Sequence, residues 1–177
     1  MKRLKIWVYG LVVVLIGTLF WYTYPRHVSI ELKGVKYQLG EENASFLKPV
    51  TVRLEGSVNR SLFGRATFSG TIDAQEDIPF SKENGNVTIK LPEKDGVIID
   101  YIQIKNGEFK IYHLGSLLSN RDMSQVTLLL MHDEGGGQSW SGRDGFMISA
   151  PAHTRQEALD ISNELMKERL TGGSPLK

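Results

Sequence analysis

Residues 50–72, VTVRLEGSVNRSLFGRATFSGTI, decide the fold of this chain, because apolar and polar side chains alternate on both sides of a turn. Side chains at every second position of a strand share one face, so this pattern predicts two strands, each with one buried face. The turn is predicted at 59–64. We expect an antiparallel hairpin in which Gly56 and Gly70 lie near each other and permit a bend or a close backbone approach.

Alternating or wholly apolar runs also occur on either side of this hairpin. They predict further strands at 28–39, 86–91, 97–104, from 109 onward, 126–131 and 146–150. The pair Asn106-Gly107 is the strongest turn signal in the chain, because both residues readily adopt the positive φ angles of a tight hairpin. The chain therefore predicts about eight strands, mostly antiparallel.

A helix follows the last strand. Thr154 and Glu157 have the spacing of a capping box, and Ala158, Ile161 and Leu165 form one apolar stripe, which predicts an amphipathic helix at 154–170. The predicted fold class is α+β: an N-terminal transmembrane helix, then a mainly antiparallel sheet or half-barrel with the C-terminal helix packed on it. The alternative is a sandwich with the helix packed at one end.

The transmembrane prediction comes from residues 6–24, which are 19 residues without a charge. A helix of that length spans ~28 Å, close to the ~30 Å of a bilayer core. A cleaved signal peptide and a buried core helix are the alternatives, but the run is long for a signal peptide and has no polar face. Aromatic residues that suit the two bilayer interfaces flank the run: Trp7, Tyr9, Trp21 and Tyr22.

Three basic residues in the first five place that tail in the cytoplasm, and so the domain outside the cell. The predicted organisation is a cytoplasmic tail (1–5), an anchor (6–24), an extracytoplasmic domain (26–171) and a disordered tail (172–177). The predicted localisation is a single-pass protein of the cell membrane, with the lipid bilayer as partner of residues 6–24.

Composition excludes several function classes. Beyond the tail, 18 basic residues face 20 acidic ones with both signs interspersed, so the chain lacks the concentrated basic surface that nucleic acid requires. The chain has no cysteine, which excludes disulfides, thiol catalysis and thiolate metal sites. We predict no cofactor.

The loop 132–144, HDEGGGQSWSGRD, is the main candidate site, because function often lies on loops held by a rigid sheet. Its candidate binding residues are Gln138, Trp140, Arg143 and Asp144. Trp140 is expected either to stack on a sugar or protein partner or to fold back onto the core. His132, Asp133 and Glu134 are candidate metal ligands, although adjacent residues of an extended chain point to opposite faces. The alternative is a structural hairpin loop.

The sequence favours a non-enzymatic extracytoplasmic module that binds a protein or a cell-envelope component, because no convergent catalytic set is visible. Two alternatives stay open. One is a metal-dependent envelope enzyme that uses the loop 132–144. The other is an accessory subunit of a membrane complex, in which Gly10 and Gly17 on one helix face allow close helix packing.

Overall fold

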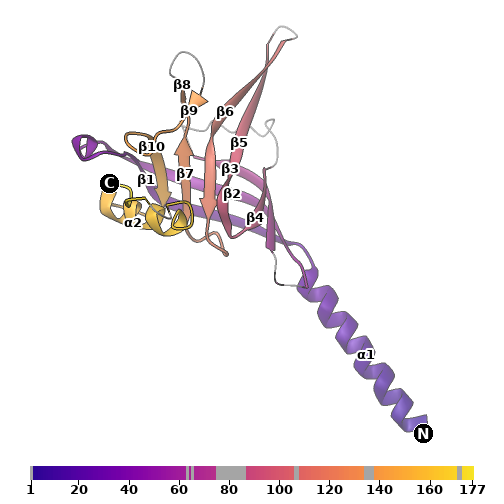
Figure 1. Cartoon of the computed structure of the whole chain (residues 1–177). Coiled ribbons are helices and arrows are strands. Elements are labelled where there is room, and N and C mark those ends of the chain that lie inside the picture. The colour runs from indigo at the N-terminus through magenta and orange to yellow at the C-terminus, as the bar shows by residue number, and fades with distance from the viewer. Residues whose placement is uncertain are drawn as a thin grey trace.

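The structure is a computed structural model that describes residues 2–62, 64, 66–74, 87–105, 108–133, 138–170 and 173–177. Its centre is an antiparallel sheet of eight strands that curls into a nearly closed barrel (Figure 1). These strands are β1 (Arg26–Gln38), β2 (Leu47–Arg60), β3 (Ala66–Asp73), β4 (Val87–Leu91), β5 (Glu93–Lys105), β6 (Glu108–Ser119), β7 (Val126–Leu130) and β10 (Phe146–Ala150). The prediction of a β-rich domain is confirmed.

The order of the strands in the sheet is β4-β3-β2-β1-β10-β7-β6-β5. Strands β1 to β4 form hairpins between neighbours in the chain, whereas β1 and β10 pair across the whole domain, with Val35 opposite Ser149. Two short strands, β8 (His132–Asp133) and β9 (Gln138–Ser139), form a separate ribbon, and a 3-10 turn, η1 (Glu41–Asn43), follows β1. The pairing of β1 with β10 therefore joins the two halves of the sheet.

The hairpin of β2 and β3 has the predicted glycine contact. Gly56 lies directly opposite Gly70, and a Cβ atom on Gly56 would be 2.6 Å from the Cα atom of Gly70 and 3.0 Å from the Phe68 ring. The fully buried Phe68 ring thus occupies the space that two side chains would otherwise fill. The predicted turn at Asn106-Gly107 joins β5 to β6, but these two residues lie outside the described part.

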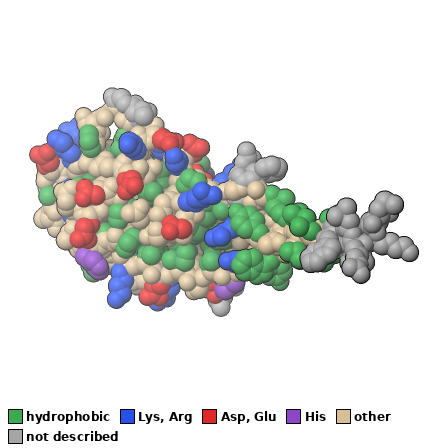
Figure 2. All heavy atoms as spheres, turned by 90° about the horizontal axis from the view of Figure 1, so that it is seen from below, with side chains coloured by type: hydrophobic (Ala, Val, Ile, Leu, Met, Phe, Trp, Pro, Cys, Tyr) green, Lys and Arg blue, Asp and Glu red, His purple; other side chains and the backbone are tan. Residues whose placement is uncertain are grey.

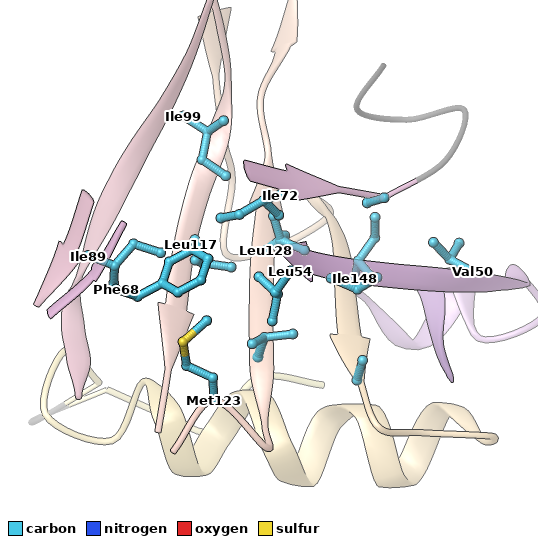
Figure 3. Packing of buried hydrophobic residues seen from close by; sticks show 14 of the residues in the cluster. Val50, Leu54, Phe68, Ile72, Ile89, Ile99, Leu117, Met123, Leu128 and Ile148 are labelled. Atoms are coloured by element: carbon cyan, nitrogen blue, oxygen red, sulfur yellow. The ribbon is translucent and has the colours of Figure 1, made fainter. Parts of the chain in front are cut away.

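Two apolar clusters stabilise the domain. The first fills the inside of the curled sheet and includes Leu54, Phe68, Ile89, Leu117 and Leu128 (Figure 3). The second lies on the opposite face of β1, β7 and β10, where the helix α2 (Arg155–Leu165) covers the sheet (Figure 1). The two faces of these central strands are therefore both buried, as the apolar run of β7 requires.

Buried hydroxyl groups attach α2 to the sheet. The Tyr37 hydroxyl on β1 lies 2.5 Å from Oγ of Ser162 on α2, and Ser162 Oγ lies 2.7 Å from Oγ of Ser149. Thr127 Oγ1 lies 3.0 Å from the same Ser149 oxygen. Burial raises the pKa of the Tyr37 phenol, although hydrogen bonds to Ser149 and Ser162 oppose this change. Each of these four hydroxyl groups therefore has a hydrogen-bond partner.

The C-terminal helix begins as predicted, with both hydrogen bonds of the Thr154–Glu157 capping box present, but it ends at Leu165 and not at 170. The last residues return to the domain. Leu176 is buried in the second cluster, its backbone N–H donates to the side chain of Asn163, and the Lys177 carbonyl accepts from the Gly40 N–H. These contacts lie within the tail 172–177 that the sequence predicts to be disordered; of its described residues, 173–175 are exposed and Leu176 is buried.

The transmembrane prediction is wrong. The first helix, α1 (Lys2–Thr23), projects away from the sheet (Figure 1), and its side chains are described from Gly10 onward. Within the described residues, no helix has both the length and the apolar character needed to cross a membrane. This finding overturns the single-pass anchor, the localisation and the fold class that included them.

The exposed surface of α1 is nonetheless apolar, as Figure 2 shows for the stem of the molecule. Its exposed side chains include Leu11, Val13, Val14, Phe20 and Trp21. Figure 1 shows that the helix joins the domain at its C-terminal end, where β1 begins.

Candidate functional site: a pocket with an arginine rim

A pocket of about 640 Å³ opens at the end of the barrel where α1 joins β1. Its boundaries come from distant parts of the chain, namely the α1–β1 junction, the ends of β1 and β2, the turn between β2 and β3, the end of β4, and the β6–β7 loop (120–125). The volume lies within the ~300–1,000 Å³ typical of small-molecule sites.

Strand pairing explains why the barrel is open here. Only the last part of β1, Val35–Gln38, pairs with β10, and β10 and β7 have 5 residues each. In the described part of the chain, β1 from Arg26 to Gly34 pairs with β2 alone. Within the described residues, the long strands β1 and β2 therefore extend beyond the short strands β10 and β7 at this end.

The wall of the pocket is apolar. The side chains that form it continue the inward rows of the sheet: Val28, Ile30, Val58, Ala66, Leu91 and Met123. Met123 closes the pocket on the side of the barrel interior, where its side chain is buried although its backbone has a φ of 61°. A positive φ is unusual for a residue with a long side chain, so the buried contacts of Met123 must compensate for it.

The rim is polar and mainly basic, with Arg26, Arg60 and Arg121 among its side chains. Figure 2 shows basic side chains where the domain narrows toward α1. The Arg26 guanidinium lies 4.8 Å from the centre of the Trp21 ring, a cation–π distance, and Nη2 of Arg121 donates to the Gly64 carbonyl at 2.9 Å. Tyr22 and Tyr24 complete the rim on the side of α1.

One carboxylate, Asp122, also lines the rim, and it accepts hydrogen bonds from a residue of its own loop. The Ser124 hydroxyl and backbone N–H donate to Oδ1 of Asp122 at 2.8 and 3.2 Å, and these bonds lower the pKa of the carboxyl group. Asp122 therefore shapes the β6–β7 loop rather than pairing with the neighbouring arginines.

The predicted site in the loop 132–144 does not form a common surface with this pocket. Trp140 is half-buried against the second apolar cluster, next to Gly145, so its ring folds back onto the core. Arg143 and Asp144 are exposed, and their backbones form hydrogen bonds: the Arg143 N–H donates to Ser141, and the Asp144 carbonyl accepts from Gln38. Gln138 lies on β9, and its side chain is outside the described part.

The candidate metal ligands are only partly described. His132 is exposed on β8, the backbone of Asp133 follows it in the same strand, and Glu134 lies outside the described residues. Within the described residues, no three histidine, aspartate or glutamate side chains lie close enough together to hold a metal ion. The metal site at His132, Asp133 and Glu134 stays a prediction.

The aromatic residues predicted to lie at membrane interfaces have other surroundings. Trp21 stacks on Arg26, and Tyr22 lines the pocket, while the side chains of Trp7 and Tyr9 lie outside the described part. Sequence reasoning missed the pocket itself. The signal available was the alternation in β1 and β2, which places Arg26 and Arg60 on the inward face together with Val28 and Val58.

Comparison with known proteins gives no match, whether against protein-family models, curated sequences or solved structures.

Proposed function

We propose that this protein is a non-enzymatic binding module whose site is the pocket with the arginine rim. The observation that carries the proposal is the combination of an apolar wall with a polar mouth in a cavity of about 640 Å³. Binding sites for small molecules have this character, with mostly apolar walls and a few polar groups that orient the ligand. The earlier hypothesis of a protein or cell-envelope partner at the loop 132–144 stays a prediction, whereas the pocket favours a small molecule.

The test is to fill the pocket. Val58 is half-buried and faces inward at the end of β2, so Val58→Trp places a large ring in the cavity. Asn59→Trp is the matched control, because Asn59 is the next residue of the same strand, is exposed, and does not line the pocket. Both variants are purified alongside the wild-type chain, and their folding is checked by thermal unfolding.

Small molecules that co-purify with each protein are then identified by mass spectrometry after denaturation, and each is added back in a thermal-shift assay. Occupation of a site in the native state raises stability by about 2.7 kcal/mol at a ligand concentration of ~100 Kd. We expect compounds that stabilise the wild type and Asn59→Trp but not Val58→Trp. The proposal fails if no compound distinguishes Val58→Trp from the other two proteins.

A further inference from the structure

The inward rows of β1 and β2 both end in arginine. Antiparallel pairing places Arg26 opposite Val58, and Arg60 lies two residues further along β2, where it pairs with Ala66. Side chains two residues apart in a strand share a face. Arg26 is therefore on the same inward face as Val28 and Ile30, and Arg60 is on the same inward face as Val58. The apolar wall therefore continues directly into two guanidinium groups at the mouth.

The third guanidinium comes from the other side of the mouth. Arg121 lies in the loop between β6 and β7, and its bond to the Gly64 carbonyl holds it across the opening, next to the turn between β2 and β3. A guanidinium has five N–H donors, and this bond uses one of them. The other donors of Arg121 stay available to a ligand in the pocket.

Arg26 and Arg60 also have donors to offer. The contact of Arg26 with Trp21 uses the face of the guanidinium and leaves the N–H groups at its edge. Arg60 has no hydrogen-bond or ion-pair partner within the described part of the chain. Three positive charges with unused donors thus surround one opening, whereas the single carboxylate there, Asp122, is bound by Ser124.

We infer that the ligand of this pocket is an anionic amphiphile, whose apolar part contacts Val28, Ile30 and Met123 and whose carboxylate or phosphate group is bound by Arg26, Arg60 and Arg121. Planar guanidinium groups match both acids, because two parallel N–H groups donate to two oxygens. This inference rests on the proposed function and adds the chemical class of the ligand. The three arginines are exposed to solvent, so a neutral amphiphile gains no ionic contact from them, and a cationic one is repelled.

The test uses the full chain and four probes with a twelve-carbon chain, namely dodecanoate, dodecyl phosphate, dodecanol and dodecyltrimethylammonium. A fifth probe, inorganic phosphate, is a head group without a chain. Affinities are measured by calorimetric titration at pH 8 and below the concentrations at which the probes aggregate. We expect dodecanoate and dodecyl phosphate to bind at least ten times more tightly than dodecanol. The ratio of their two affinities identifies which acid the site prefers.

The variants Arg60→Gln and Arg121→Gln are expected to weaken both anionic probes about tenfold each and to leave dodecanol unchanged. Arg53→Gln is the matched control, because Arg53 lies on the same strand as Arg60 but on the outward face, where it pairs with Glu31 at 3.1 Å. Arg60→Lys, which keeps the charge but loses the planar fork, should recover part of the affinity.

Each failure is distinguishable. If dodecanol binds as tightly as the anions and Val58→Trp abolishes its binding, the pocket binds ligands but the anionic class is wrong. If Arg53→Gln weakens dodecanoate as much as Arg60→Gln does, the arginine rim is not the recognition element. If inorganic phosphate alone binds as tightly as dodecyl phosphate, the apolar wall takes no part. If no amphiphile binds, the inference and the proposed function both fail for this class.

Discussion

Removal of the Ser162 hydroxyl provides a stringent test of the contact between α2 and the sheet. In Ser162→Ala the Tyr37 hydroxyl loses its partner at 2.5 Å and keeps Ser149 Oγ at 3.4 Å, the Ala158 carbonyl at 3.5 Å and Met147 Sδ, a weak acceptor, at 3.6 Å. These distances are long for an O–H···O bond, whose usual length is ~2.7–2.8 Å. The fully buried phenol is therefore left without an adequate partner.

The magnitude follows from this difference. An unsatisfied buried hydroxyl costs ~1–3 kcal/mol, and alanine gains ~0.5 kcal/mol as a better helix former, so we expect Ser162→Ala to lower the free energy of unfolding by about 1.5 kcal/mol. Tyr37→Phe removes the hydroxyl itself. Ser162 then keeps the Ala158 carbonyl at 3.0 Å and Ser149 at 2.7 Å, so the loss is one hydrogen bond, about 1 kcal/mol.

The double variant Tyr37→Phe/Ser162→Ala tests whether the two hydroxyl groups depend on each other. With Phe at 37 and Ala at 162 no hydroxyl is left unsatisfied, so the loss should be about 1 kcal/mol rather than the additive 2.5 kcal/mol. Urea unfolding followed by tryptophan fluorescence measures all three values, with unchanged slopes as the check that the unfolding reaction is the same. Additivity within ~0.5 kcal/mol would refute the reasoning, since independent sites add to that accuracy.

Three further results are expected. Because burial raises the pKa of Tyr37 above 10.0, the unfolded chain releases its phenolic proton first, so stability should fall by up to ~1.4 kcal/mol per pH unit above about pH 10; urea unfolding from pH 8 to 11 should show a smaller decline in Tyr37→Phe, and an equal decline in both proteins would contradict this. Gly56→Val should cost ~3 kcal/mol in urea unfolding, because the new side chain displaces the Phe68 ring and the opposing strand; a loss under 1 kcal/mol would contradict this contact. Thr154→Ala should cost ~1 kcal/mol in thermal unfolding through loss of the helix cap, and Thr154→Ser should restore it.

The sequence predicted most of what depends on neighbouring residues. Alternation in residues 50–72 identified β2, β3 and their turn, and the two glycines placed near each other are paired in the structure. The capping box at Thr154 identified the start of α2. These features are local, because a two-residue period and a four-residue cap leave their pattern within a few residues of sequence.

Features that depend on distant pairing were not predicted. The contact of β1 with β10 joins residues more than 100 positions apart, and nothing in either strand specifies the other. The place of Arg121 next to the β2–β3 turn follows only from the curled sheet. Trp140 had two open interpretations, and Gly145 decided between them, because the absence of a side chain there leaves room for the indole ring.

The first helix shows the limit of composition as a guide. An uncharged run of 19 residues satisfied the length rule for a membrane span, but within the described residues no helix has both the length and the apolar character needed to cross a membrane. The helix α1 includes Gly10, Gly17, Thr18 and Thr23. Its last turn contributes Tyr22 to a pocket, so this end of the helix belongs to the domain's candidate site.

The pocket is a consequence of unequal strand lengths. β1 and β2 have 13 and 14 residues, whereas β7 and β10 have 5 each, so the inward rows of the long strands continue after the opposite wall has ended. A continuation that served only the core would be apolar to its last residue or would turn outward to water. Here it ends in Arg26 and Arg60, while Met123 adopts a positive φ to close the interior behind them. Both guanidinium groups are exposed at the mouth of the pocket, so their N–H groups are accessible to the anion that we propose as ligand.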